Sequence, residues 1–125
     1  MSAIEIRVLT GPHRNHCLLL TAPAIYTVGR REDCAICFTG DCNDLLISRQ
    51  HCQLEFDPPR IVLRDLASRN GTYLNGRRIL SGSEVALEDG DLVTVGNTSF
   101  RIGVVDGSEL HAPVADSGRD CLQTC

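Results

Sequence analysis

SRQHCQLEFDPPRIVLRDLASRNGTYLNG, residues 48–76, carries the strongest structural signals in this chain of 125 residues. Apolar and polar residues alternate over 52–56, which is typical of a half-buried β-strand. Asp57-Pro58-Pro59 ends that strand, because proline has no backbone N–H to donate. A second apolar run covers 61–66, and the dipeptide Asn75-Gly76 favours a tight hairpin turn because both residues tolerate positive φ. The segment therefore predicts consecutive short strands joined by tight turns.

The rest of the chain shows the same alternation of short apolar runs and turn residues. Further strands are expected at 4–8, 17–20, 25–28, 35–38, 73–74, 78–79, 85–87, 92–95 and 99–105. The sequence contains no amphipathic helical pattern of convincing length. About ten or eleven short strands with regular turns predict an all-β sandwich, in which a ligand site would lie in the loops at one end.

The composition is that of one ordinary globular domain and argues against nucleic-acid and membrane partners. The chain is 42% hydrophobic and has a net charge of −4, whereas a general binder of nucleic acid or acidic membranes usually has an excess of basic residues. No apolar run approaches the ~20 residues that a bilayer span requires. All 12 basic residues are arginines, and the planar guanidinium suits bidentate phosphate contacts.

Seven cysteines are present, an odd number without a regular disulfide framework. Together with the absence of a signal-peptide core near Met1, this predicts thiols in a reducing, cytoplasmic setting. Cys34-Ala35-Ile36-Cys37, near Cys42, Cys52 and His51, leaves a zinc or redox site as an alternative. No second CxxC or HxxxH pair follows, and Cys34 and Cys37 would point to opposite faces of a strand. We therefore expect no metal and no other cofactor.

Half of the arginines lie at or next to turns: Arg30, Arg31, Arg49, Arg69, Arg77 and Arg78. Arg30, Ser48-Arg49 and Ser68-Arg69-Asn70 belong to three different connections between expected strands. Loops at one end of a sandwich bring such residues together, and in an acidic protein they would form a local cationic patch. A phosphorylated side chain, with a charge of about −1.5 to −2 and three acceptor oxygens, is a suitable ligand for that patch.

Six motifs in order make the chain resemble the forkhead-associated (FHA) domain family over approximately residues 4 to 105. They are Gly29-Arg30, Ser48-Arg49-Gln50-His51, Asp65-Leu66, Ser68-Arg69-Asn70-Gly71-Thr72, Leu74-Asn75-Gly76 and Gly90-Asp91-Leu92-Val93-Thr94-Val95-Gly96. The resemblance implies an eleven-stranded antiparallel β-sandwich that binds phosphothreonine peptides through its apical loops. It also implies a non-catalytic signalling module whose partners are threonine-phosphorylated proteins or peptides, substrates of a serine/threonine kinase.

The resemblance assigns roles to individual residues. Arg30 corresponds to the phosphate-binding arginine, Ser48 to the hydroxyl that donates to phosphate, and Asn70 to the residue that bonds the peptide backbone. Further phosphate or peptide contacts are implied for Arg49, Arg69 and Asn75. His51 corresponds to a structural histidine, and structural support is likewise expected from Gly29, Gly71 and Gly76.

An enzyme and a phosphate-independent binding module are the alternatives to this interpretation. Ser48 and His51 could nominally enter a catalytic triad, but no nucleophile elbow and no glycine-rich phosphate loop before a helix is present, so we expect no enzyme. A divergent domain that binds proteins without phosphate remains an alternative. Asp41 and Asp44, in the polar loop 39–44, would disfavour an acidic residue three positions after the phosphothreonine.

Residues 1–106 are expected to form the FHA domain, followed by a flexible acidic tail or linker at 107–125. The latter segment mixes glycine, serine and proline with acidic residues and has few apolar ones, a composition typical of segments without a packed core. The abrupt end at Cys125 suggests a part of a longer protein.

Overall fold

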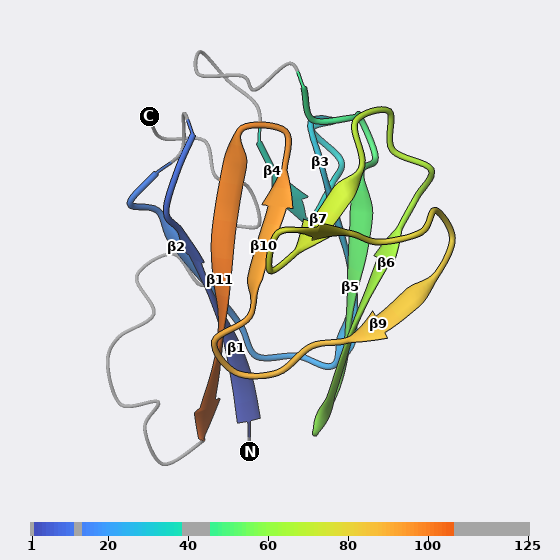
Figure 1. The fold of residues 1–125 in the computed structure, drawn as a ribbon. Helices are drawn as coiled ribbons and strands as arrows, with labels where there is room; N and C mark the ends of the chain where they lie inside the picture. The colour runs from blue at the N-terminus through green and yellow to red at the C-terminus, as the bar shows by residue number, and fades with distance from the viewer. Residues whose placement is uncertain (1, 12–13, 39–45, 107–125) are drawn as a thin grey trace.

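A computed structural model describes residues 2–11, 14–38 and 46–106. The described chain forms two β-sheets that pack face to face (Figure 1). The strands are β1 (Ser2–Val8), β2 (Cys17–Leu20), β3 (Ala24–Gly29), β4 (Ile36–Cys37), β5 (Cys52–Asp57), β6 (Arg60–Asp65), β7 (Thr72–Leu74), β8 (Arg77–Arg78), β9 (Glu84–Ala86), β10 (Leu92–Val95) and β11 (Thr98–Asp106). The polar loop 39–44, Cys42 and the expected tail at 107–125 lie outside the described residues.

One sheet has six strands in the order β2-β1-β11-β10-β7-β8, and the other has five in the order β4-β3-β5-β6-β9. Neighbouring strands are antiparallel except β3 and β4, which pair in parallel over two residue pairs. The expected all-β sandwich is therefore confirmed, with this one parallel pair as the departure. The ends of the described chain meet in the larger sheet, where Ser2 pairs with Asp106.

The strands form where the sequence pattern predicts them, with bounds that move by one or two residues. In β5, Cys52, Leu54 and Phe56 are buried while the residues between them are partly exposed, as the alternation requires. Asn75 and Gly76 both have positive φ, 50° and 85°, and turn the chain between β7 and β8. The tight turn is thus accommodated by the two residue types that tolerate this conformation best.

A single hydrophobic core lies between the two sheets. Phe38 and Phe100, both fully buried in it, stack with ring centroids 6.3 Å apart, within the range that aromatic pairs prefer. The other buried apolar residues of this cluster are Ile4, Ile6, Val8, Leu20, Val28, Ile36, Ile47, Cys52, Leu54, Phe56, Ile61, Leu63, Leu87, Val93, Val95 and Ile102. Ile47 belongs to the core although it lies in a connection, so the core anchors the loop that precedes β5.

Three connections meet at one end of the sandwich: β3–β4, β4–β5 and β6–β7. In Figure 1 the described parts of β4–β5 and β6–β7 lie side by side at the top of the molecule, and hydrogen bonds join them from Arg69 to Ser48 and from Asn70 to Leu46. The core thereby presents at a common surface residues as far apart in the chain as Arg30 and Asn70.

Candidate functional site

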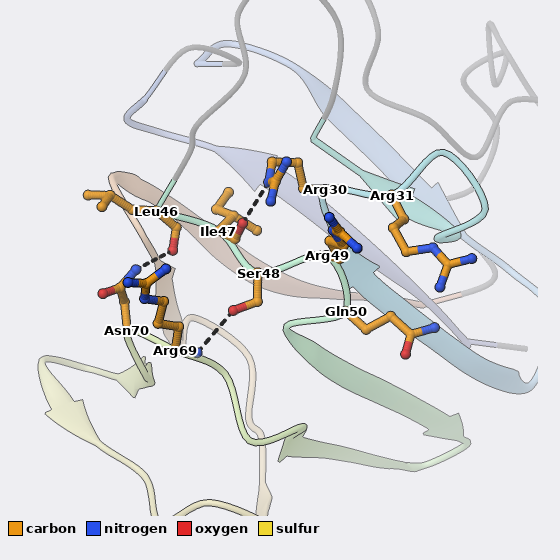
Figure 2. A pocket seen from close by; sticks show the side chains of 9 residues that line it. All are labelled: Arg30, Arg31, Leu46, Ile47, Ser48, Arg49, Gln50, Arg69 and Asn70. Carbon is orange, nitrogen blue, oxygen red and sulfur yellow. Dashed lines mark hydrogen bonds between the residues drawn. The ribbon is translucent and has the colours of Figure 1, made fainter.

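The three connections enclose a hollow of about 450 Å³ (Figure 2). Its lining residues are Arg30, Arg31, Leu46, Ile47, Ser48, Arg49, Gln50, Arg69 and Asn70. Five of the six predicted ligand-contacting residues are in this set. Residues from separate connections therefore converge, as the turn pattern and the family resemblance both anticipated.

The β3–β4 and β4–β5 connections are held together through the carbonyl oxygen of Arg49. This oxygen accepts hydrogen bonds from the backbone N–H groups of Arg30 and Arg31, both at 3.1 Å, and from the thiol of Cys34 at 3.2 Å. Gly29 makes the approach possible, because a Cβ atom there would lie 2.1 Å from the Arg49 oxygen. Structural support was expected from Gly29, and the contact that requires glycine there is the close approach of the Arg49 backbone.

His51 holds the β4–β5 and β6–β7 connections in register. Its ring is fully buried, and Nδ1 accepts a hydrogen bond from the backbone N–H of Ser48 at 3.0 Å. Nε2 lies 2.7 Å from the carbonyl oxygen of Gly71. Because Nδ1 accepts a hydrogen bond and the carbonyl oxygen of Gly71 can only accept one, the hydrogen-bond pattern assigns the ring proton to Nε2. These two bonds link the His51 ring to both connections, and its structural role stays a prediction.

Asp65, at the end of β6, holds the β6–β7 connection through hydrogen bonds to its carboxylate. Its carboxylate accepts bonds from the Ser68 backbone N–H at 3.2 Å, the Ser68 hydroxyl at 2.5 Å and the Thr72 hydroxyl at 2.6 Å. Burial raises the pKa of Asp65, but the hydrogen bonds from Ser68 and Thr72 outweigh burial, so the pKa lies below its ordinary value of 3.8. An ionised, satisfied carboxylate therefore fixes the turn that presents Asn70.

The polar side chains at the hollow are oriented by bonds to the surrounding loops. Arg30 donates through Nε to the Ile47 carbonyl at 3.0 Å, and Asn70 donates through Nδ2 to the Leu46 carbonyl at 2.8 Å. Figure 2 shows both bonds. The terminal nitrogens of Arg30 and the second amide hydrogen of Asn70 are left to serve a ligand.

Ser48 is arranged as a hydrogen-bond donor. Its Oγ accepts the backbone N–H of Arg69 at 3.0 Å, and this bond uses an oxygen lone pair but not the hydroxyl proton. In the view of Figure 2 the Ser48 side chain lies between Arg69 and Arg49. The hydroxyl proton can therefore be donated to an acceptor in the hollow, which Arg49 and Arg69 also line.

The hollow is strongly cationic although the whole chain carries a net charge of −4. Four arginines line it, and its lining set includes no acidic residue. Among the described residues, only Arg31 of the four has an ion pair, an exposed one with Asp33 at 2.9 Å. An exposed pair of this kind contributes little and exchanges readily. The site is therefore chemically suited to a multiply charged anion with several acceptor oxygens.

Asn75 and its neighbour Gly76 lie outside the hollow's lining set. The Asn75 amide donates through Nδ2 to Asp91 at 3.1 Å and accepts the Leu92 N–H at Oδ1 over 2.9 Å. These bonds join the β7–β8 turn to the start of β10. Peptide contact by Asn75 stays a prediction, although both polar atoms of its side chain are already bonded.

Several residues of the site were not anticipated from the sequence as ligand or support residues. Arg31, Leu46, Ile47 and Gln50 line the hollow, while Asp65, Ser68 and Thr72 support it. The Asp65–Ser68 spacing of three is a recognisable signal, because aspartate often bonds backbone and hydroxyl groups a few residues ahead. Leu46 and Ile47 contribute carbonyl groups, for which side-chain identity gives no signal.

Three of the four described cysteines are buried, Cys17 is exposed, and none of the four lines the hollow. Cys34, Cys37 and Cys52 are all buried, and burial raises the pKa of the Cys52 thiol, with nearby Asp65 adding to the effect. Within residues 2–11, 14–38 and 46–106, no three His, Cys, Asp or Glu side chains are placed to hold a metal ion. The same part of the chain has no helix of sufficient length and apolarity to cross a bilayer.

The sequence pattern of the FHA domain matches residues 26–96. The chain is 38% identical over 79 residues to nibrin of Danio rerio, and the matched region covers 63% of the chain and 9% of nibrin. It is 33% identical over 97 residues to the angiogenic factor with G patch and FHA domains 1 of Mus musculus, and this match covers 73% of the chain and 13% of that protein. The chain thus spans only a small part of the length of these relatives.

Solved structures show the same architecture. The FHA domain of a hypothetical Arabidopsis thaliana protein superposes with a TM-score of 0.77 at 29% identity, covering 86% of this chain and 89% of that one. The N-terminal FHA domain of Rad53p from S. cerevisiae, solved in complex with a phosphothreonine peptide, has a TM-score of 0.68 at 25% identity. That match covers 81% of this chain and 94% of the yeast domain.

Proposed function

The chain belongs to the forkhead-associated (FHA) domain family, and on this basis we propose that its cationic hollow binds phosphothreonine in partner proteins. The domain would act as a non-catalytic module that mediates phosphorylation-dependent protein–protein interaction in signalling. Its partners would be substrates of a serine/threonine kinase. The complex of the yeast relative with a phosphothreonine peptide supports this ligand class.

The observation that carries the proposal is the convergence of Arg30, Ser48 and Asn70 on one hollow. In the proposed complex, the Arg30 guanidinium and the Ser48 hydroxyl donate to phosphate oxygens. Asn70 bonds the peptide backbone next to the phosphothreonine. Arg49 and Arg69, on either side of Ser48 in Figure 2, supply further positive charge. None of these roles requires a nucleophile or a metal ion.

The expected affinity follows from the number of donors. A hydrogen bond to a charged group contributes ~1.5–3 kcal/mol net, and micromolar binding corresponds to about 8 kcal/mol. Two or three bonds from Arg30, Ser48 and Asn70 supply a large part of that free energy. Contacts to the rest of the peptide must supply the remainder, so a free phosphate ion should bind much more weakly than a phosphopeptide.

A titration of matched peptides tests the proposal. A degenerate library first identifies a phosphothreonine peptide that binds, and its affinity is then compared with that of the unphosphorylated counterpart. Arg30→Ala should lower the affinity for the phosphopeptide about 10-fold or more, the equivalent of one lost charge-assisted bond. Arg60→Ala is the matched control, because Arg60 is an exposed arginine at the start of β6, at the other end of the strand from the hollow.

Two outcomes would contradict the proposal. Equal affinity for the phosphorylated and unphosphorylated peptides would favour the phosphate-independent alternative. An Arg30→Ala variant that binds as tightly as the Arg60→Ala control would show that the hollow is not the phosphate site.

A further inference from the structure

A fifth arginine, Arg78, lies beside the hollow without lining it. Arg78 is on the short strand β8, and its side chain packs against Gly71, the residue that follows Asn70. A Cβ atom on Gly71 would lie 2.5 Å from Nε and 2.9 Å from Cζ of Arg78. Glycine at this position therefore brings a guanidinium against the backbone of the turn that presents Asn70.

The Arg78 guanidinium is not neutralised by the part of the chain that the structure describes. Other exposed or half-exposed arginines have carboxylate partners: Arg7 pairs with Glu5, and Arg64 pairs with Glu84. No acidic side chain within residues 2–11, 14–38 and 46–106 forms an ion pair with Arg78, and the residue is exposed. Its charge is thus available to a ligand that follows the surface away from Asn70.

Arg77 provides an internal comparison. Strand residues alternate between faces, and the pairing of β7 with β8 puts Arg78 opposite Tyr73 and Arg77 opposite Leu74. Leu74 packs against the core, so Arg77 and Arg78 lie on different faces of the same hairpin. Both are exposed, and the three atoms nearest to a Cβ on Gly71 all belong to Arg78.

The spacing suits a peptide that continues beyond the phosphothreonine. Consecutive Cα atoms are ~3.8 Å apart, so the Gly71 backbone against which Arg78 packs is one residue step from Asn70. An extended peptide advances ~3.3 Å per residue. A ligand bonded by Asn70 can therefore bring a side chain only a few residues from the phosphothreonine to the Arg78 guanidinium.

The geometry points to Arg78 as a second anion-binding position, which takes an anionic side chain flanking the phosphothreonine on the same peptide. This inference rests on the proposed function and narrows its ligand class to peptides with two anionic groups. The second group can be a carboxylate or a second phosphate, since both offer the paired oxygens that a guanidinium binds. The Arg78 position extends the cationic surface of the hollow past Arg69 and Asn70.

The test uses a phosphothreonine peptide with neutral flanking residues as the reference ligand. A single glutamate is placed in turn at each flanking position, with glutamine at the same position as the matched neutral peptide. At the best position, phosphoserine replaces glutamate to distinguish a phosphate from a carboxylate ligand. Affinities are measured for the unaltered domain, for Arg78→Gln and for Arg77→Gln, which removes the same charge from the other face of β8.

We expect glutamate at one position to tighten binding about two- to fivefold over glutamine, the range for an exposed ion pair. The gain should be lost in Arg78→Gln, persist in Arg77→Gln and shrink with added salt. The reference peptide should bind all three proteins equally, which would show that the hollow is intact in both variants.

The inference would be overturned if glutamate raised the affinity over glutamine equally in Arg78→Gln and Arg77→Gln, or at no position of the peptide. Neither result would contradict the proposed function. If the unaltered domain binds the reference peptide no better than its unphosphorylated form, the proposed function fails and the inference fails with it.

Discussion

Replacing Gly29 with alanine should damage both the stability and the ligand site of this domain. The added Cβ would lie 2.1 Å from the carbonyl oxygen of Arg49 and 2.8 Å from its carbonyl carbon. Ordinary contacts between carbon and a carbonyl oxygen are ~3.3–3.6 Å, so the two connections must separate by about 1 Å. The obstacle is backbone, which cannot rotate away as a flexible side chain can.

The magnitude follows from what this separation breaks. The Arg49 oxygen accepts two backbone bonds at 3.1 Å, from Arg30 and Arg31, and an outward shift of about 1 Å takes both beyond hydrogen-bonding range. Each bond contributes ~0.5–1.5 kcal/mol net, and inserting a methyl group into a packed site costs ~1–3 kcal/mol. Gly29→Ala should therefore lower the free energy of unfolding by about 2–6 kcal/mol.

Urea denaturation measures this loss, and Gly76→Ala is the matched control. Gly76 has a φ of +85° but no atom within 4 Å of its hypothetical Cβ, so alanine there costs only the ~1–2 kcal/mol of a left-handed backbone. Gly29→Ala should also weaken phosphothreonine-peptide binding, because the Arg49 oxygen joins the loop of Arg30 to the loop of Ser48. Gly76→Ala should leave that affinity unchanged.

The reasoning is refuted if Gly29→Ala loses no more stability than Gly76→Ala and binds the phosphopeptide as tightly as the unaltered domain. Such a result would mean that the close approach of the two connections does not determine the geometry of the hollow.

Three further substitutions address the supporting residues. His51→Ala removes both ring hydrogen bonds from a fully buried site and should cost about 2–4 kcal/mol in urea denaturation; an unchanged urea midpoint would exclude a bracing role. Asp65→Asn should cost about 1.5–3 kcal/mol at neutral pH. The folded-state pKa of Asp65 is below its ordinary value of 3.8. The ionised carboxylate therefore stabilises the domain fully at a pH above 3.8, and this contribution is lost as the pH falls through the folded-state pKa. The stability difference between Asp65→Asn and the unaltered domain should therefore shrink in acid, and a constant difference in denaturation at pH 7 and pH 3 would contradict this. Asn75→Gly keeps the turn but loses two side-chain bonds, so it should lower stability by about 1–2 kcal/mol. A fluorescence titration of this variant tests the peptide contact predicted for Asn75: weaker phosphopeptide binding would support that contact, and unchanged affinity would contradict it.

The sequence alone determined the fold class and most of the strands. Alternation in 52–56 and the turn at Asn75-Gly76 depend on neighbouring residues along one segment, and local backbone chemistry is enough to interpret them. The six ordered motifs also identified Arg30, Ser48, Arg49, Arg69 and Asn70, and all five line the hollow. These side chains could be chosen in advance because their residue types carry the donors and charge that a phosphate requires.

Only the tertiary structure decided which residues meet, because strand pairing joins segments that are distant in the chain. Three such features have no local signal in the sequence. They are the parallel pairing of β3 with β4, the carbonyl groups of Leu46 and Ile47 at the hollow, and the hydrogen bond between Asn75 and Asp91. The contact between Arg78 and Gly71 is of the same kind. Identical arginines at 77 and 78 acquire different surroundings because successive strand residues point to opposite faces.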